Sequence, residues 1–140
     1  MSAEHFFLDT NVIVYALYSD SPVKKATAQT LMNKAAAGKG WISFQVVQEC
    51  INLALKKFRP VPPAEEVRAM VQDILLPICR VNPNPSFYLD ALETQEATRL
   101  SWYDCLILQA AVDAGCKTLY SEDLQDGFRY RGVTVTNPFK

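Results

Sequence analysis

A short apolar run, Phe6-Phe7-Leu8, is followed at once by three polar residues, Asp9-Thr10-Asn11. Apolar runs that end in a polar cluster are typical of buried strands, and the residue after such a strand lies at its C-terminal end. In α/β sheets, ligands gather at this edge. The stretch therefore predicts a central strand with Asp9 at the edge where a site would form, although an Asp in this position is also a common turn or helix-cap residue.

The rest of the chain alternates between strand and helix patterns. Further strands are expected at 41–42, 77–81, 117–120 and 133–136, and helices at 22–38, 44–58, 64–76, 93–98 and 101–114. This alternation predicts an α/β fold, a three-layer sandwich in which helices flank a central, mostly parallel sheet. The 140 residues have the length of one domain, so we interpret 1–140 as a single unit.

Composition narrows the classes of function. The chain is 49% hydrophobic and 21% charged, which indicates a globular core, and its 14 basic and 15 acidic residues argue against a strong nonspecific nucleic-acid binder. The single histidine, His5, and four scattered cysteines argue against a zinc site and against catalysis that needs an imidazole. The first residues have neither a basic head nor a long apolar stretch, so we expect a cytoplasmic protein without a membrane segment.

Two acidic residues interrupt helices that are otherwise apolar. Glu49 has Val46 and Leu53 as helical neighbours, and Asp104 is followed one turn later by Leu108, so each carboxylate lies on an apolar helix face. For Asp104 there is an alternative, because Ser101-x-x-Asp104 has the spacing of a capping box. Either residue is therefore a candidate for a buried acidic site.

A fourth carboxylate, Asp123, follows the strand expected to end at Tyr120, although a solvated loop acid is the alternative explanation. Carboxylates that meet in one crevice cost several kcal/mol each to desolvate unless a cation compensates them. No Lys or Arg lies within four positions of Asp9, Glu49 or Asp104. Carboxylate ligands without nitrogen or sulfur partners indicate a hard cation, Mg²⁺ or Mn²⁺.

Five segments resemble those of the PIN-domain ribonucleases, and the resemblance extends over nearly the whole chain: Phe7 to Val12, Val46 to Glu49, Ser101 to Ile107, Tyr120 to Leu124, and Thr136 to Phe139. The length is similar to that of the single-domain VapC type, the toxin of bacterial toxin-antitoxin pairs. The resemblance implies a PIN-like parallel sheet and Mg²⁺-dependent or Mn²⁺-dependent cleavage of single-stranded RNA regions. It also implies a homodimer and a small antitoxin partner.

The resemblance also implies roles for particular residues. The four acids Asp9, Glu49, Asp104 and Asp123 would be the catalytic metal ligands, supported by a polar ring of Thr10, Asn11 and Ser121. Glu122 or Asp126 could share the role of Asp123. Ser121 stands where the family often has Thr, and this change keeps the hydroxyl group.

Substrate contact needs positive charge outside the acidic centre. Without the four acids, 14 basic residues stand against 11 acidic ones. Two basic clusters are expected to flank the crevice and bind RNA, unless they are merely solvated charges: Lys56, Lys57 and Arg59 in one, Arg129 and Arg131 in the other. Tyr15, Tyr18, Trp102 and Tyr103 are candidates for stacking on bases, with core or dimer packing as the alternative.

Two other functions remain open. One is a catalytically silent PIN-like scaffold that binds RNA or protein, which the presence of all four acids disfavours. The other is a phosphohydrolase with Asp9 as nucleophile, because a strand ending in Asp-Thr-Asn is similar to the haloacid dehalogenase pattern. That pattern has a second Asp two residues on, where this chain has Asn11.

Overall fold

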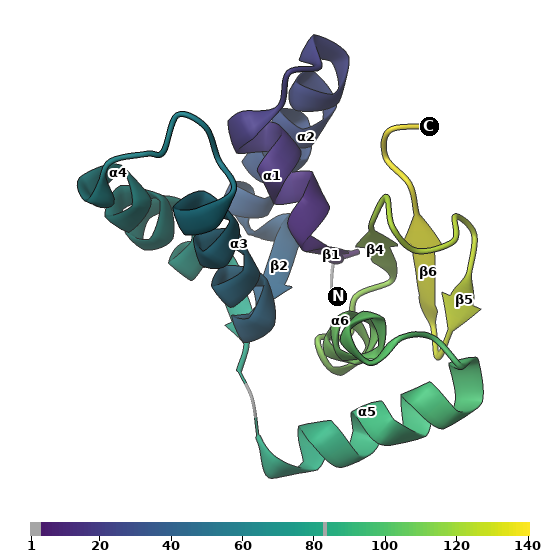
Figure 1. The fold of residues 1–140 in the computed structure, drawn as a ribbon. Helices are drawn as coiled ribbons and strands as arrows, with labels where there is room; N and C mark the ends of the chain where they lie inside the picture. The colour runs from purple at the N-terminus through teal and green to yellow at the C-terminus, as the bar shows by residue number, and fades with distance from the viewer. Residues whose placement is uncertain (1–3, 83) are drawn as a thin grey trace.

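The computed structural model describes residues 4–82 and 84–140 and contains a six-stranded sheet (Figure 1). The strand order is β3-β2-β1-β4-β6-β5, parallel throughout except for the antiparallel pair β5 and β6. The strands are β1 Phe6–Leu8, β2 Gly40–Ser43, β3 Cys79–Val81, β4 Thr118–Tyr120, β5 Arg129–Tyr130 and β6 Val133–Thr136. The predicted α/β fold with a mostly parallel sheet is confirmed.

Six α-helices cover the sheet: α1 Thr10–Tyr18, α2 Pro22–Lys34, α3 Phe44–Lys56, α4 Ala64–Ala69, α5 Pro85–Thr98 and α6 Trp102–Asp113. Shorter helical turns occupy Ala35–Lys39, Met70–Leu75 and Leu76–Ile78. In Figure 1 the paired helices α5 and α6 lie below the strands, and α1 and α2 lie above them. No helix in residues 4–82 and 84–140 is long and apolar enough to cross a membrane.

Two elements were not predicted from the sequence, and one was predicted too short. Helix α1 is rich in β-branched and aromatic residues, which favour strands, but Asp9 caps its first turn and it packs closely against α2. Strand β5 has only two residues and forms because β6 pairs with it. Helix α5 begins at Pro85, where Asn84 caps it, eight residues before the expected start.

The strand order determines where a ligand would bind. Strand β1 lies between β2 and β4. The connection after β1 leads to β2 on one side, and the connection after β4 leads to β5 at the opposite edge of the sheet. The chain therefore diverges beyond the C-terminal ends of β1 and β4, which opens a crevice there. The two ends stay joined, because the backbone N–H of Asp9 donates to the carbonyl of Tyr120 at 3.0 Å.

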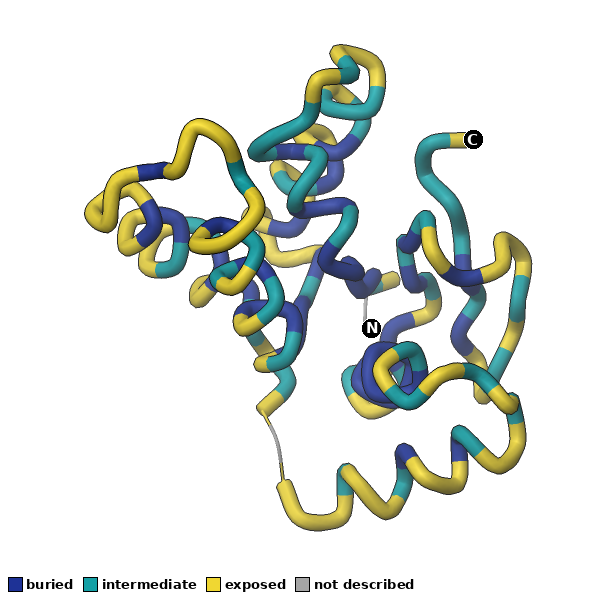
Figure 2. The backbone as a smooth tube through the Cα atoms, viewed as in Figure 1, coloured by how far each residue is buried: buried dark blue, intermediate teal, exposed yellow. Residues whose placement is uncertain are grey.

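The core surrounds the central strand. Phe7 and Leu8 of β1 are completely buried, as are Leu119 of β4 and Leu108 of α6. Figure 2 shows the same pattern, with buried backbone along the inner strands and the inward face of α6 and exposed backbone along α4 and α5. Because β1 is buried on both faces, the residue that follows it enters the crevice from the interior of the protein.

Gly40 is the tightest point of this core. A Cβ atom there would lie 2.3 Å from the Phe6 ring and 2.7 Å from Cβ of Ala35. We predict that Gly40→Ala lowers the free energy of unfolding by about 1–3 kcal/mol, because the ring and the helix must both move. Urea denaturation measures this change. The neighbouring exposed Lys39 is the control, and an equal loss in Lys39→Ala would contradict the packing argument.

Candidate functional site

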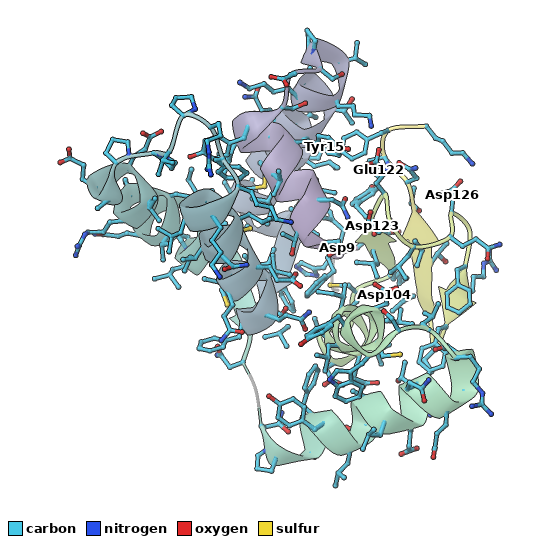
Figure 3. All side chains as sticks on the ribbon, in the orientation of Figure 1. Asp9, Tyr15, Asp104, Glu122, Asp123 and Asp126 are labelled. Atoms are coloured by element: carbon cyan, nitrogen blue, oxygen red, sulfur yellow. The ribbon has the colours of Figure 1, made fainter. Side chains whose placement is uncertain are left out.

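The four predicted acids line one open pocket of about 520 Å³. Asp9 comes from the end of β1, Glu49 from α3, Asp104 from α6, and Asp123 from the loop after β4. Figure 3 shows Asp9, Asp104 and Asp123 turned toward the same region, with Asp126 farther out. Four segments that are distant in sequence thus place their carboxylates around one space.

Asp9 is the most buried of the four, with 7% of its surface exposed. Its Oδ1 accepts from the backbone N–H of Thr10 at 2.7 Å, and its Oδ2 accepts from the Ser121 hydroxyl at 2.8 Å. Burial raises the pKa of Asp9 to about 6, although these two hydrogen bonds lower it, and the nearby charges of Asp123 and Glu49 raise it further. Both oxygens of this side chain are therefore held by hydrogen bonds, one from the first turn of α1 and one from the end of β4.

Glu49 is half-buried on α3 and is held at both oxygens. The Thr10 hydroxyl donates to Oε1 at 2.5 Å, and the Gln45 side-chain amide donates to Oε2 at 3.3 Å. Thr10 therefore links the first two acids, since its backbone N–H binds Asp9 and its hydroxyl binds Glu49.

Asp104 lies in the first turn of α6. The Ser101 hydroxyl accepts from the backbone N–H of Asp104 at 3.2 Å, which is one half of a capping box. In the described part of the chain, the Asp104 carboxylate makes no return hydrogen bond to the backbone N–H of Ser101. Ser101 alone caps the helix, so the carboxylate is left to face the pocket.

The loop after β4 is organised by two polar side chains. The fully buried Ser121 accepts from the backbone N–H groups of Asp123 and Leu124 at 3.1 and 3.3 Å. From α1, the Asn11 amide nitrogen donates to Oδ2 of Asp123 at 3.2 Å, and its oxygen accepts from the backbone N–H of Glu122 at 3.1 Å. Thr10, Asn11 and Ser121 thus each donate a hydrogen bond to at least one of the four acids.

Glu122 and Asp126 differ from Asp123 in their partners. Glu122 also lines the pocket, but it is 2.7 Å from the Lys24 ammonium and accepts from the Tyr15 hydroxyl. These hydrogen bonds, Lys24 first, lower the pKa of Glu122. Asp126 does not line the pocket and accepts from the backbone N–H of Asn137. Of the three candidates for the fourth acid, Asp123 alone lines the pocket without a cationic partner in the described chain.

The donor chemistry of the pocket fits a divalent cation. Within residues 4–82 and 84–140, no Lys or Arg forms an ion pair with Asp9, Glu49, Asp104 or Asp123. All four offer oxygen, the ligand that Mg²⁺ and Mn²⁺ prefer. In that same part of the chain, no three acidic, histidine or cysteine side chains lie close enough together to enclose an ion. The residue types and the uncompensated charge fit such an ion.

A sequence model described as the PIN domain matches residues 6–130. The chain belongs to the PIN-domain family. No protein with curated annotation matches it significantly.

Solved structures of similar proteins include three bacterial examples of the PIN fold. VapC20 of Mycobacterium tuberculosis, a Sarcin-Ricin loop cleaving toxin, is 17% identical with a TM-score of 0.61, and the match covers 84% of this chain and 89% of that one. FitAcB from Neisseria gonorrhoeae is 18% identical with a TM-score of 0.65, covering 96% and 98%. VapBC2 from Rickettsia felis, bound to a DNA fragment from their promoter, is 19% identical with a TM-score of 0.64, covering 94% and 97%.

The basic residues predicted to bind RNA lie outside the acidic pocket of this PIN domain, and none of the five lines it. Of the five, Lys56 has the helical position that best matches the site, because it follows Glu49 by two turns on the same face of α3. The Arg59 guanidinium donates to the carbonyls of Lys56 and Phe58, and Arg131 lies 3.9 Å from Glu93. Lys57 and Arg129 are exposed. RNA binding by these residues stays a prediction.

The sequence analysis did not identify Lys24 and Gln45 as members of the site. Lys24 reaches Glu122 across 98 positions, and Gln45 reaches Glu49 across one turn of α3. Lys24 has no sequence signal, because its partner is distant. The i, i+4 spacing of Gln45 and Glu49 on one helix was the signal available for the second contact.

The raised pKa of Asp9 predicts how the free energy of unfolding depends on pH when a chelator keeps divalent metal out of the pocket. The folded state holds this proton up to about pH 6, whereas an unfolded Asp loses it near 3.8. The free energy of unfolding therefore falls as pH rises from about 4 to about 6. We predict that Asp9→Asn removes this fall and is more stable than the wild type at pH 7.5, by at most about 3 kcal/mol.

Urea denaturation between pH 4 and 8 measures this difference, with Asp126→Asn as the control outside the pocket. A constant difference between Asp9→Asn and the wild type across that range would contradict the buried charge.

Proposed function

We propose that this PIN domain is a metal-dependent endoribonuclease that cuts single-stranded regions of RNA. The observation that supports it is the buried Asp9, which shares one pocket with three further carboxylates that, like Asp9, have no cationic partner in the described chain. Such a pocket is costly for a folded protein unless a cation enters it. A cation that takes part in the reaction would explain why the protein keeps these carboxylates together despite the free energy that their desolvation costs.

The residues have separate tasks in this proposal. Asp9, Glu49 and Asp104 would hold an Mg²⁺ or Mn²⁺ ion, and Asp123 would complete its ligands or help to hold a second ion. A bound divalent ion offsets phosphate charge and makes a water molecule more acidic. Thr10 and Ser121 keep the Asp9 oxygens in a constant direction through their hydrogen bonds. The described residues that line the pocket include no histidine, so a carboxylate would accept the proton of the attacking water.

We further propose that the protein is the toxin of a bacterial toxin-antitoxin pair and acts in the cytoplasm as a homodimer. The similar structures support this role, since VapC20 is a toxin that cleaves the Sarcin-Ricin loop. The partner would be a small antitoxin that places a basic side chain among the four carboxylates. That side chain would supply the compensating charge by ion pairing and would exclude the metal.

Cleavage of RNA by the purified protein tests this function. We predict that Mn²⁺ supports cutting of single-stranded RNA, that chelator abolishes it, and that Asp104→Asn reduces the rate roughly 100-fold or more. Asp126→Asn should keep the wild-type rate, since Asp126 lies outside the pocket. Cutting that survives chelation, or that persists in Asp104→Asn, would contradict the proposed chemistry.

Thermal melting with and without Mn²⁺ tests the metal ligands separately from activity. We predict that saturating Mn²⁺ stabilises the wild type, by about 2.7 kcal/mol at 100 times Kd. Asp123→Asn should lose most of this gain. Glu122→Gln should keep the stabilisation by Mn²⁺, because the Glu122 carboxylate is already paired with the Lys24 ammonium and accepts a hydrogen bond from the Tyr15 hydroxyl. If Mn²⁺ does not change the melting temperature of the wild type, the result would favour the catalytically silent scaffold instead.

A further inference from the structure

A second hollow, of about 350 Å³, adjoins the acidic pocket. It lies between the beginning of α3, the end of β3, and helices α5 and α6. Five of its lining residues are aromatic: Phe44, Phe87, Tyr88, Trp102 and Tyr103. No charged side chain of the described residues lines it. We call it the aromatic hollow.

Two residues connect the aromatic hollow to the acidic pocket. Tyr103 lines both, immediately precedes Asp104, and leaves 66% of its surface exposed. Gln45 lines the hollow, while its side-chain amide donates to Glu49 at 3.3 Å. A ligand that extends from one space to the other therefore passes Tyr103.

The chemistry of the two spaces differs in the way that the parts of a nucleotide differ. The acidic pocket fits a metal-bound phosphate. The aromatic hollow offers flat rings, and the neutral side-chain amides of Gln45 and Gln48 lie beside them. Aromatic rings stack on unpaired bases of single-stranded RNA, and amides donate to and accept from base edges.

We propose that the aromatic hollow binds the unpaired base of the nucleotide beside the phosphate that is cut, with Tyr103 stacking on that base. The proposal rests on the nuclease function proposed above. It selects unpaired RNA, because a base inside a duplex is already stacked and paired. A flat apolar surface would suit a second copy of the chain equally well, but a concave space with amides that continues into the acidic pocket favours a base.

Fluorescence of Trp102 tests the hollow without any cleavage. The chain has two tryptophans, so Trp41→Phe leaves Trp102 as the only one. The probes are the four ribonucleoside 5′-monophosphates, with ribose 5-phosphate as the probe that lacks a base. We expect at least one nucleotide to change Trp102 emission saturably while ribose 5-phosphate does not. Tyr103→Ala should weaken that binding at least about fivefold, and Tyr103→Phe should restore it.

RNA cleavage provides the second measurement. Tyr103→Ala should raise KM at least about fivefold and leave kcat within about twofold, because stacking is lost while the carboxylates remain. Leu89→Ala is the matched control, since Leu89 is also 66% exposed but does not line the hollow. If the wild type cuts no RNA, the nuclease proposal fails, and the fluorescence titration still decides the base site.

Three results would overturn the base site. The first is an absence of emission change with all four nucleotides, and the second is an equal change with ribose 5-phosphate. The third is a Tyr103→Ala variant that binds nucleotides normally but sediments as a monomer where the wild type is a dimer. That last result would show that the hollow is a contact between two copies of the chain.

Discussion

A carboxylate at the end of a fully buried strand is the constraint on which the rest of the site depends. Strand β1 has no exposed face, so Asp9 begins inside the protein, where its charge is poorly solvated and its pKa rises to about 6. Two hydrogen bonds, from Thr10 and Ser121, reduce this cost without removing it. The negative charge that remains is the physical basis of the proposed cation site.

The strand order brings the other residues of the site next to the buried carboxylate of Asp9. Because β1 and β4 are parallel neighbours, Asp9 and the loop after β4 lie side by side, and the chain leaves the two strands in opposite directions, which opens the crevice between them. Ser121 contacts Asp9 with its hydroxyl and orders the loop that carries Asp123, while Asn11 holds the same loop from α1. The hydrogen bonds that stabilise the crevice are the same ones that direct its carboxylates, so fold stability and site geometry are coupled.

The pocket and the neighbouring hollow differ in their chemistry, and in the proposed function this difference separates two kinds of recognition. Charge dominates among the four acids, where a metal and a phosphate would compensate one another. Beyond Tyr103, the described residues that line the aromatic hollow are aromatic or uncharged, and they include the side-chain amides of Gln45 and Gln48. Lys24 and Tyr15 keep Glu122 paired at the opposite side. Glu122 is therefore already paired and would not compete with the other acids for the proposed cation.

Much of this organisation was predictable from local patterns. The apolar run before Asp9, the acids on apolar helix faces, and the alternation of strands and helices determined the fold class and the candidate acids, because burial imposes its period on the sequence. Tertiary structure alone decided that α1 is a helix and that Lys24 pairs with Glu122. It also decided that Tyr103 borders two spaces. Those features depend on contacts between segments far apart in the chain, and such contacts leave no periodic signal.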